Sequence, residues 1–69
     1  MIKNNLKFFR ELQGISQAEL AKKVGISRNS VSSIERGEFI PKLDTAFKLC
    51  KVLDVSIYSL FVFIQERKE

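Results

Sequence analysis

Three residues, Gly25-Ile26-Ser27, separate two segments that each carry the start and stop signals of a short helix, and this spacing constrains the fold most strongly. Before the corner, Ser16-Gln17-Ala18-Glu19 has the pattern of a capping box, in which serine and glutamate satisfy each other's backbone N–H groups. After it, Ser27 can cap a second helix, which Gly37 ends. Two helices of roughly eight to nine residues must therefore meet at a very tight turn.

The residues around this corner meet the mechanical needs of a helix-turn-helix. Ala21 is small where two helices cross closely, and Gly25 can adopt the positive φ that turns the chain within three residues. Three apolar side chains can hold the second helix against the first: Ile26, Val31 and Ile34. The sequence therefore predicts a helix-turn-helix over residues 17–36.

Apolar residues at helical spacing predict three further helices. The first spans about residues 5 to 13, between the capping residues Asn4-Asn5 and the terminating Gly14, and its expected buried stripe is Leu6, Phe9 and Leu12. The fourth follows Pro41, and its expected apolar stripe is Leu43, Ala46, Phe47, Leu49, Cys50 and Leu53. A short fifth helix, capped by Ser56, carries Ile57, Leu60 and Phe61.

The last apolar segment, Phe61-Val62-Phe63-Ile64, is rich in aromatic and β-branched residues and has no helical period. A short strand is therefore preferred over a helix, with Met1-Ile2-Lys3 as the candidate partner strand. The sequence predicts an all-α, five-helix fold with a short terminal β-ribbon, made of strands at residues 1–3 and 61–65, within one subunit or between two. A chain of 69 residues is expected to form a single domain over residues 1–69.

The residue inventory excludes several classes of function. The chain has one cysteine and no histidine, so it can form no intrachain disulfide and cannot assemble the common zinc-ligand sets. Cys50 lies on the apolar side of the fourth predicted helix, where packing is favoured over redox sensing. With no carboxylate cluster and no glycine-rich phosphate loop, the sequence predicts no enzyme and no metal, cofactor or small-molecule ligand.

The same inventory leads to an expected location. The longest uninterrupted apolar stretch, Leu60 to Ile64, is far shorter than the ~20 residues that cross a bilayer. The N-terminus lacks the apolar core of a signal peptide, and a single cysteine fits a reducing compartment. We therefore expect a cytoplasmic protein without a membrane partner.

Positive charge is concentrated in the body of the chain. Twelve Lys and Arg against eight Asp and Glu give a net charge of +4, and residues 1–53 alone hold ten basic and five acidic side chains. A sequence pI near 9.5 fits a polyanionic partner, because neutralised phosphates release counterions. Charge alone does not identify that partner.

The outer face of the third predicted helix gives a sharper signal. At about 100° per residue, the side chains opposite Val31 and Ile34 are polar hydrogen-bonding groups, with Arg28 at the flank near the helix start. They are Asn29, Ser32, Ser33 and Arg36. A face of this kind suits the major groove of double-stranded DNA, where asparagine can pair with adenine and arginine with guanine.

These residues together resemble a known family. The stretch from Ile15 to Ser27, followed by Val31-Ser32 and Ile34-Glu35-Arg36-Gly37, is similar to the phage repressor/Cro (XRE) helix-turn-helix family, over roughly four fifths of the chain. Within that family the chain is most similar to minimal single-domain bacterial regulators of the cytolysin-repressor type. The resemblance implies a lambda-repressor-like DNA-binding domain that carries a β-ribbon and acts as a homodimer.

The resemblance also implies roles for individual residues. It implies that Gln17 holds a DNA phosphate and that Arg28, Asn29 and Ser33 read bases. We add Ser32 to the base-reading set and Arg36 and Lys42 to the phosphate contacts, with capping of the helix dipole as the alternative role of Arg36. In phage members an arginine of the first helix pairs with a glutamate near the end of the third, and Arg10 and Glu35 match these positions. After Gly37 this chain departs from the basic residues of phage members, since it has Glu38-Phe39 there.

The sequence therefore predicts a transcriptional regulator, acting as a repressor, that binds a pseudo-palindromic operator as a homodimer. Four apolar residues are expected to contact the ribbon or a second subunit: Ile2, Phe8, Phe61 and Phe63. The alternative is a protein-interaction module, such as an antitoxin, that uses this terminal hydrophobic patch. RNA binding is a weaker option, because Phe47, Tyr58 and Phe61 are expected to pack between helices rather than to form a stacking surface.

Overall fold

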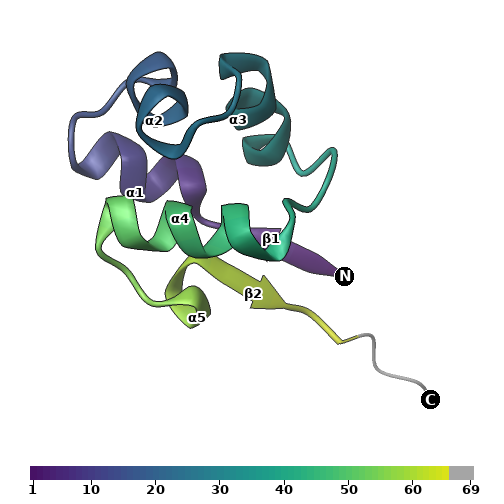
Figure 1. The fold of residues 1–69 in the computed structure, drawn as a ribbon. Coiled ribbons are helices and arrows are strands. Elements are labelled where there is room, and N and C mark those ends of the chain that lie inside the picture. Colours follow the sequence, from purple (N-terminus) through teal and green to yellow (C-terminus); the bar gives the residue numbers. More distant parts are fainter. Residues whose placement is uncertain (66–69) are drawn as a thin grey trace.

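The computed structural model describes residues 1–65, which form five helices and two strands. The order along the chain is β1 (Ile2–Asn4), α1 (Leu6–Leu12), α2 (Gln17–Val24), α3 (Arg28–Glu35), α4 (Leu43–Leu53), α5 (Ile57–Leu60) and β2 (Phe61–Phe63). Figure 1 shows α2 and α3 at one end of the molecule and the two strands at the other, with α4 between them. The predicted fold of five helices and a terminal β-ribbon is confirmed.

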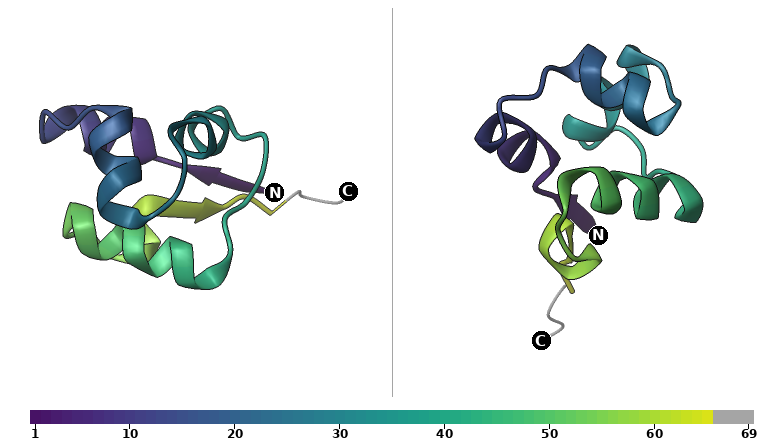
Figure 2. Two further views of the ribbon diagram at one scale, coloured as in Figure 1. Left: turned by 45° about the horizontal axis from the view of Figure 1, so that its top comes forward. Right: turned by 60° about the vertical axis from the view of Figure 1, so that its left-hand side comes forward.

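The two strands pair antiparallel within one chain, with Ile2 opposite Phe63 and Asn4 opposite Phe61. The predicted bounds, 1–3 and 61–65, were shifted and too long at the C-terminal end. Met1 and Ile64 still exchange backbone hydrogen bonds beyond the strand ends, of 3.0 and 2.7 Å. The left-hand view in Figure 2 shows the two strands side by side.

The core lies where α2 packs against both α3 and α4. Its largest fully buried side chains are Leu6, Leu20, Ile34, Leu49, Leu53, Leu60 and Val31. Cys50 is also buried, as predicted, and burial raises the pKa of its thiol. Packing in the core therefore explains why a cysteine is found at position 50.

Several residues assigned to apolar stripes are exposed instead. Leu12 is 69% exposed because the inward face of α1 is taken by Leu6 and Arg10, one helical turn apart. Leu43 and Phe47 on α4 are 69% and 54% exposed, since the buried side of that helix is Ala46, Leu49, Cys50 and Leu53. Tyr58 is 88% exposed, so the expectation that Phe47 and Tyr58 pack between helices was wrong.

The corner between α2 and α3 is built as the sequence predicts. Gly25 adopts φ +86°, and the N–H groups of Gly25 and Ile26 both donate to the carbonyl of Ala21, at 2.8 and 3.0 Å. Ser16 and Glu19 form the complete capping box, and these bonds lower the pKa of Glu19. Ser27 accepts from the N–H of Ser30 at 3.0 Å. Local signals therefore fix the relative placement of the two helices.

None of the helices within residues 1–65 is long and apolar enough to cross a membrane.

Candidate nucleic-acid interface

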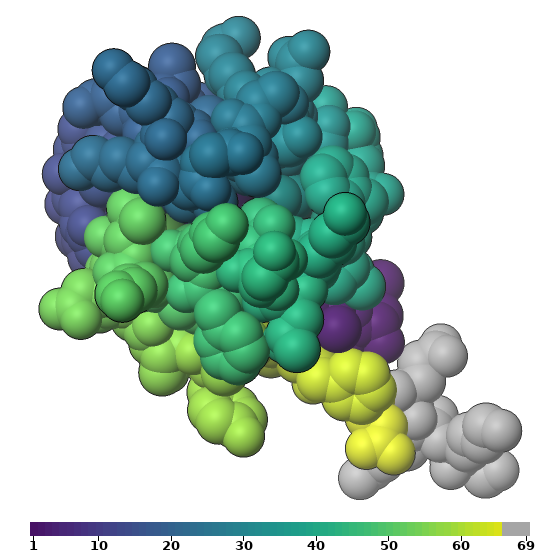
Figure 3. Space-filling model, in the orientation of Figure 1, coloured from purple at the N-terminus to yellow at the C-terminus, as the bar shows by residue number. Residues whose placement is uncertain are grey.

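The outward face of α3 is the candidate interface. Val31 and Ile34 are the buried residues of this helix. Because they lie on one face, the side chains on the opposite face point outward. Arg28 and Asn29 are exposed at its start, and Ser32 and Ser33 are half-buried along it. Figure 3 shows the α2 and α3 side chains at the upper edge of the molecule with no segment covering them. A flat or grooved partner can therefore approach this face.

At the end of α3 the guanidinium of Arg36 is held by its own chain. Its Nε and Nη2 donate to the two carboxylate oxygens of Glu38 at 2.8 and 3.0 Å. Nη2 also donates to the hydroxyl of Ser33 at 3.3 Å, and Nη1 donates to the hydroxyl of Ser32. The structure thus joins three predicted DNA contacts to a residue that sequence reasoning did not place in the site. The guanidinium lowers the pKa of Glu38.

Beneath this face a buried ion pair joins α1 to α3. Nε of Arg10 donates to Oε2 of Glu35 at 2.6 Å, and the two side chains are only 10% and 5% exposed. The structure therefore brings together the pair that the family resemblance implied. Arg10 also donates to the carbonyl of Ile15 at 2.8 Å, which fixes the loop before α2. The hydrogen bond to Glu35 raises the pKa of Arg10.

Gln17 joins the same network. This predicted phosphate contact is half-buried at the start of α2, and its Nε2 donates to Oε1 of Glu35 at 2.9 Å. An amide nitrogen carries two N–H groups, so one donor is left for a second acceptor. Glu35, the last residue of α3, therefore accepts hydrogen bonds from both α1 and α2. No local sequence pattern signals the bond from Gln17.

Lys42 lies across a cleft from α3 and does not belong to the outward face of that helix. It is the exposed residue before α4 and makes no side-chain capping bond. A cleft of about 210 Å³ separates this part of the chain from α3 and is lined by Ile26, Ser30, Ile34, Phe39, Pro41, Lys42 and Thr45.

The predicted ribbon contacts fall into two groups. Phe61 is half-buried against the core, whereas Ile2 and Phe63, paired across the ribbon, are 40% and 68% exposed. Phe8 is 60% exposed on α1, and its ring meets that of Phe9 edge-on at 5.1 Å between centroids. The far end of the ribbon therefore presents uncovered apolar surface.

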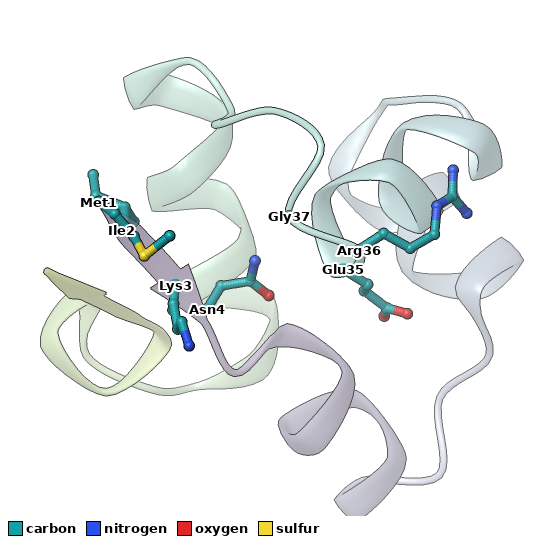
Figure 4. Close-up of a pocket in the computed structure, with 7 residues that line it drawn as sticks. All are labelled: Met1, Ile2, Lys3, Asn4, Glu35, Arg36 and Gly37. Carbon is teal, nitrogen blue, oxygen red and sulfur yellow. The ribbon is translucent and has the colours of Figure 1, made fainter. Parts of the chain in front are cut away.

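Asn4 connects the ribbon to the end of α3, and sequence reasoning treated it only as a helix cap. Its Nδ2 donates to the carbonyl of Ile34 at 2.8 Å, and its Oδ1 accepts from the N–H of Leu6 at 3.0 Å. A cleft of about 330 Å³ lies here between β1 and the helix end. Figure 4 shows Asn4 directed toward α3 and Arg36 directed away from the cleft. Asn4 therefore fixes the ribbon to the helix that carries the candidate interface.

Known proteins are similar to this chain in sequence. The Helix-turn-helix family profile matches residues 6–60. An HTH-type transcriptional regulator of Methanocaldococcus jannaschii is 42% identical over 62 residues, which cover 90% of this chain and 94% of that protein. The HTH-type transcriptional regulator SinR of Bacillus subtilis is 39% identical over 61 residues, covering 87% of this chain and 55% of SinR.

Two solved complexes are similar in structure. SinR in complex with DNA has a TM-score of 0.74 at 38% identity, covering 80% of this chain and 89% of that chain. The P22 c2 repressor protein in complex with a synthetic operator has a TM-score of 0.76 at 33% identity, covering 78% and 82%. Since the profile matches most of the chain and the first relative aligns over nearly all of it, the chain belongs to the helix-turn-helix family of transcriptional regulators.

Proposed function

We propose that this regulator is a sequence-specific repressor that binds a pseudo-palindromic operator as a homodimer, with α3 in the major groove. The observation that carries the proposal is the uncovered outward face of α3, which joins exposed Arg28 and Asn29 to the hydroxyls of Ser32 and Ser33. The SinR–DNA complex and the operator complex of the P22 c2 repressor support it. A net charge of +4 favours approach to a polyanion.

In this proposal the start of α3 reads bases. Arg28 can donate two hydrogen bonds to guanine, and Asn29 can pair with the edge of adenine. Ser32 and Ser33 complete the base-reading set, since each hydroxyl can donate or accept. The exposed side chains of Arg28 and Asn29 need no rearrangement within the chain to reach a groove.

Phosphate contacts then set the register of the helix on the duplex. Gln17 can offer the amide N–H that Glu35 does not use, and Lys42 can supply a charge at the edge of the groove. Arg36 is the third phosphate contact, and it must first leave Glu38. These contacts add affinity for every sequence and make binding dependent on salt concentration.

The homodimer would use the exposed end of the ribbon. Ile2 and Phe63 lie there, and an apolar surface of this kind is stabilised when a second copy covers it. Two copies related by a two-fold axis would place their α3 helices in successive major grooves, about 34 Å apart. The same patch favours the second candidate function, in which it binds a different protein, as an antitoxin does.

Selection of bound sequences from a random DNA pool tests the proposal. A symmetric motif with half-sites about 10 base pairs apart is expected, together with a dimeric mass for the purified protein. A motif without symmetry from a monomeric protein would contradict the homodimer. No enrichment, with no binding to any duplex at low salt, would leave the protein-interaction function as the better explanation.

A further inference from the structure

The strongest unexplained feature of the candidate interface is that all three nitrogens of the Arg36 guanidinium donate hydrogen bonds within the chain. A guanidinium has five N–H donors, and the four hydrogen bonds of Arg36 all go to groups of its own chain. Two of these bonds join it to the carboxylate of Glu38 in the paired geometry that guanidinium groups also form with phosphate. Glu38 thus occupies the donors that a DNA phosphate would need.

We propose that Glu38 competes with DNA for Arg36 and thereby lowers the affinity of this regulator for every duplex. The proposal rests on the DNA-binding function proposed above. Since a phosphate carries no sequence information, the competition acts on operator and random DNA alike. The choice between sequences is left to the base-reading set on α3.

The backbone holds Glu38 in position for this role. Gly37 adopts φ +75°, and the N–H of Glu38 donates to the carbonyl of Ser33 at 3.0 Å. The chain therefore folds back beside the end of α3 instead of leaving it. Arg36 bridges the carboxylate to the hydroxyls of Ser32 and Ser33, so the negative charge lies at the edge of the outward face.

The exposure of the pair makes the competition reversible. The side chains of Arg36 and Glu38 are 54% and 55% exposed, so water surrounds them and the attraction between them is weak. A phosphate can therefore replace the carboxylate without opening the core.

The test measures DNA affinity of Glu38→Gln, which keeps the side-chain shape and removes the charge. Wild type and variant are titrated against a selected operator and a scrambled duplex of equal length, across a series of salt concentrations. We expect Glu38→Gln to bind both duplexes about three- to fivefold more tightly at low salt. The dependence of log affinity on log salt should stay close to that of wild type, because Arg36 contacts a phosphate in both complexes.

Asp54→Asn is the matched control. It removes one negative charge from the exposed cap at the far end of α4, where the residue adopts φ +56°, a conformation that asparagine tolerates. We expect its affinity to change by less than about twofold, because screening weakens distant surface charges. An equal gain in both variants would overturn the proposal in favour of a general charge effect.

The same substitution made in an Arg36→Gln variant decides whether Glu38 acts through Arg36. In Arg36→Gln, the further change Glu38→Gln should give little or none of its gain, since no guanidinium is left to release. A gain of full size there would overturn the competition in favour of simple repulsion, and weaker operator binding by the single Glu38→Gln variant would overturn it too. If wild type binds DNA and Glu38→Gln gains nothing, the inference alone fails; if wild type binds no duplex, the proposed function fails first.

Discussion

Within residues 1–65 the structure contains two arginine–glutamate pairs with similar hydrogen bonds and opposite surroundings. Arg10 and Glu35 are 10% and 5% exposed, whereas Arg36 and Glu38 are 54% and 55% exposed. The buried pair joins α1, the loop before α2 and the end of α3 through Ile15 and Gln17. The exposed pair is only two residues apart and contacts the hydroxyls on the outward face of α3.

This difference shows that the same arginine–glutamate ion pair has one role when it is buried and another when it is exposed. A buried charge that loses its partner remains out of water, so the buried pair is required for the fold. An exposed pair can open at little cost, because water replaces the lost partner. The first pair therefore holds α3 in place, and the second is free to take part in what α3 binds.

Arg10→Ala is the change with the largest expected effect. It leaves the carboxylate of Glu35 buried without its guanidinium and should lower the free energy of unfolding by about 3–5 kcal/mol. For a domain of this size that is a large part of a total of about 3–10 kcal/mol. Chemical denaturation followed by circular dichroism measures it. Arg36→Ala is the control, and a loss of similar size there would contradict the distinction between the pairs.

Replacing both buried partners sharpens the same comparison. Arg10→Met alone should be strongly destabilising, while Arg10→Met combined with Glu35→Leu should recover about 1–3 kcal/mol, because no unpaired charge then stays buried. Denaturation curves of the two single variants and the double variant give the coupling energy. If the double variant is less stable than either single one, the hydrogen bonds to Ile15 and Gln17 outweigh the ion pair.

Arg28→Ala addresses the exposed face. Its expected cost is about 1–3 kcal/mol of DNA binding, concentrated at one base position of the operator, because a base contact is lost. The stability of the protein should stay within about 0.5 kcal/mol of wild type, since this exposed side chain fills no core position. Affinities for single-base operator variants measure the effect. An equal loss for all sequences would make Arg28 a phosphate contact instead.

Much of the fold could be predicted because its signals are local. The capping box, the turn at Gly25 and the Ser27 cap each depend on residues within a few positions of one another. The buried stripe of α3 follows from helical period alone. The terminal ribbon needed a change of pattern at Phe61, and its short length left the exact bounds open.

What could not be predicted depends on tertiary contacts. Leu12 was expected in the core, but the inward position on α1 belongs to Arg10, whose partner is 25 residues away in sequence. The bond from Gln17 to Glu35 spans 18 residues and has no sequence signature. Glu38 was missed for another reason: a helical wheel stops at the end of a helix, and the chain folds back there through Gly37.

The smallest expected effect is on the pH dependence of stability. Because Arg36 lowers the pKa of Glu38 below its ordinary 4.5, the unfolded chain binds a proton more readily than the folded one. The contribution of this carboxylate is present above pH 4.5 and is lost as the pH falls through the lowered value. Glu38→Gln should therefore lose slightly less stability than wild type between about pH 5 and about pH 3. Parallel denaturation series measure this difference.

Glu19→Gln provides the comparison, because the capping box lowers the pKa of Glu19 without any arginine. Glu19→Gln should also lose less stability than wild type as the pH falls, whatever residue stands at position 36. The effect of Glu38→Gln should instead disappear when Arg36 is replaced, and its persistence would mean that the exposed pair does not form in solution.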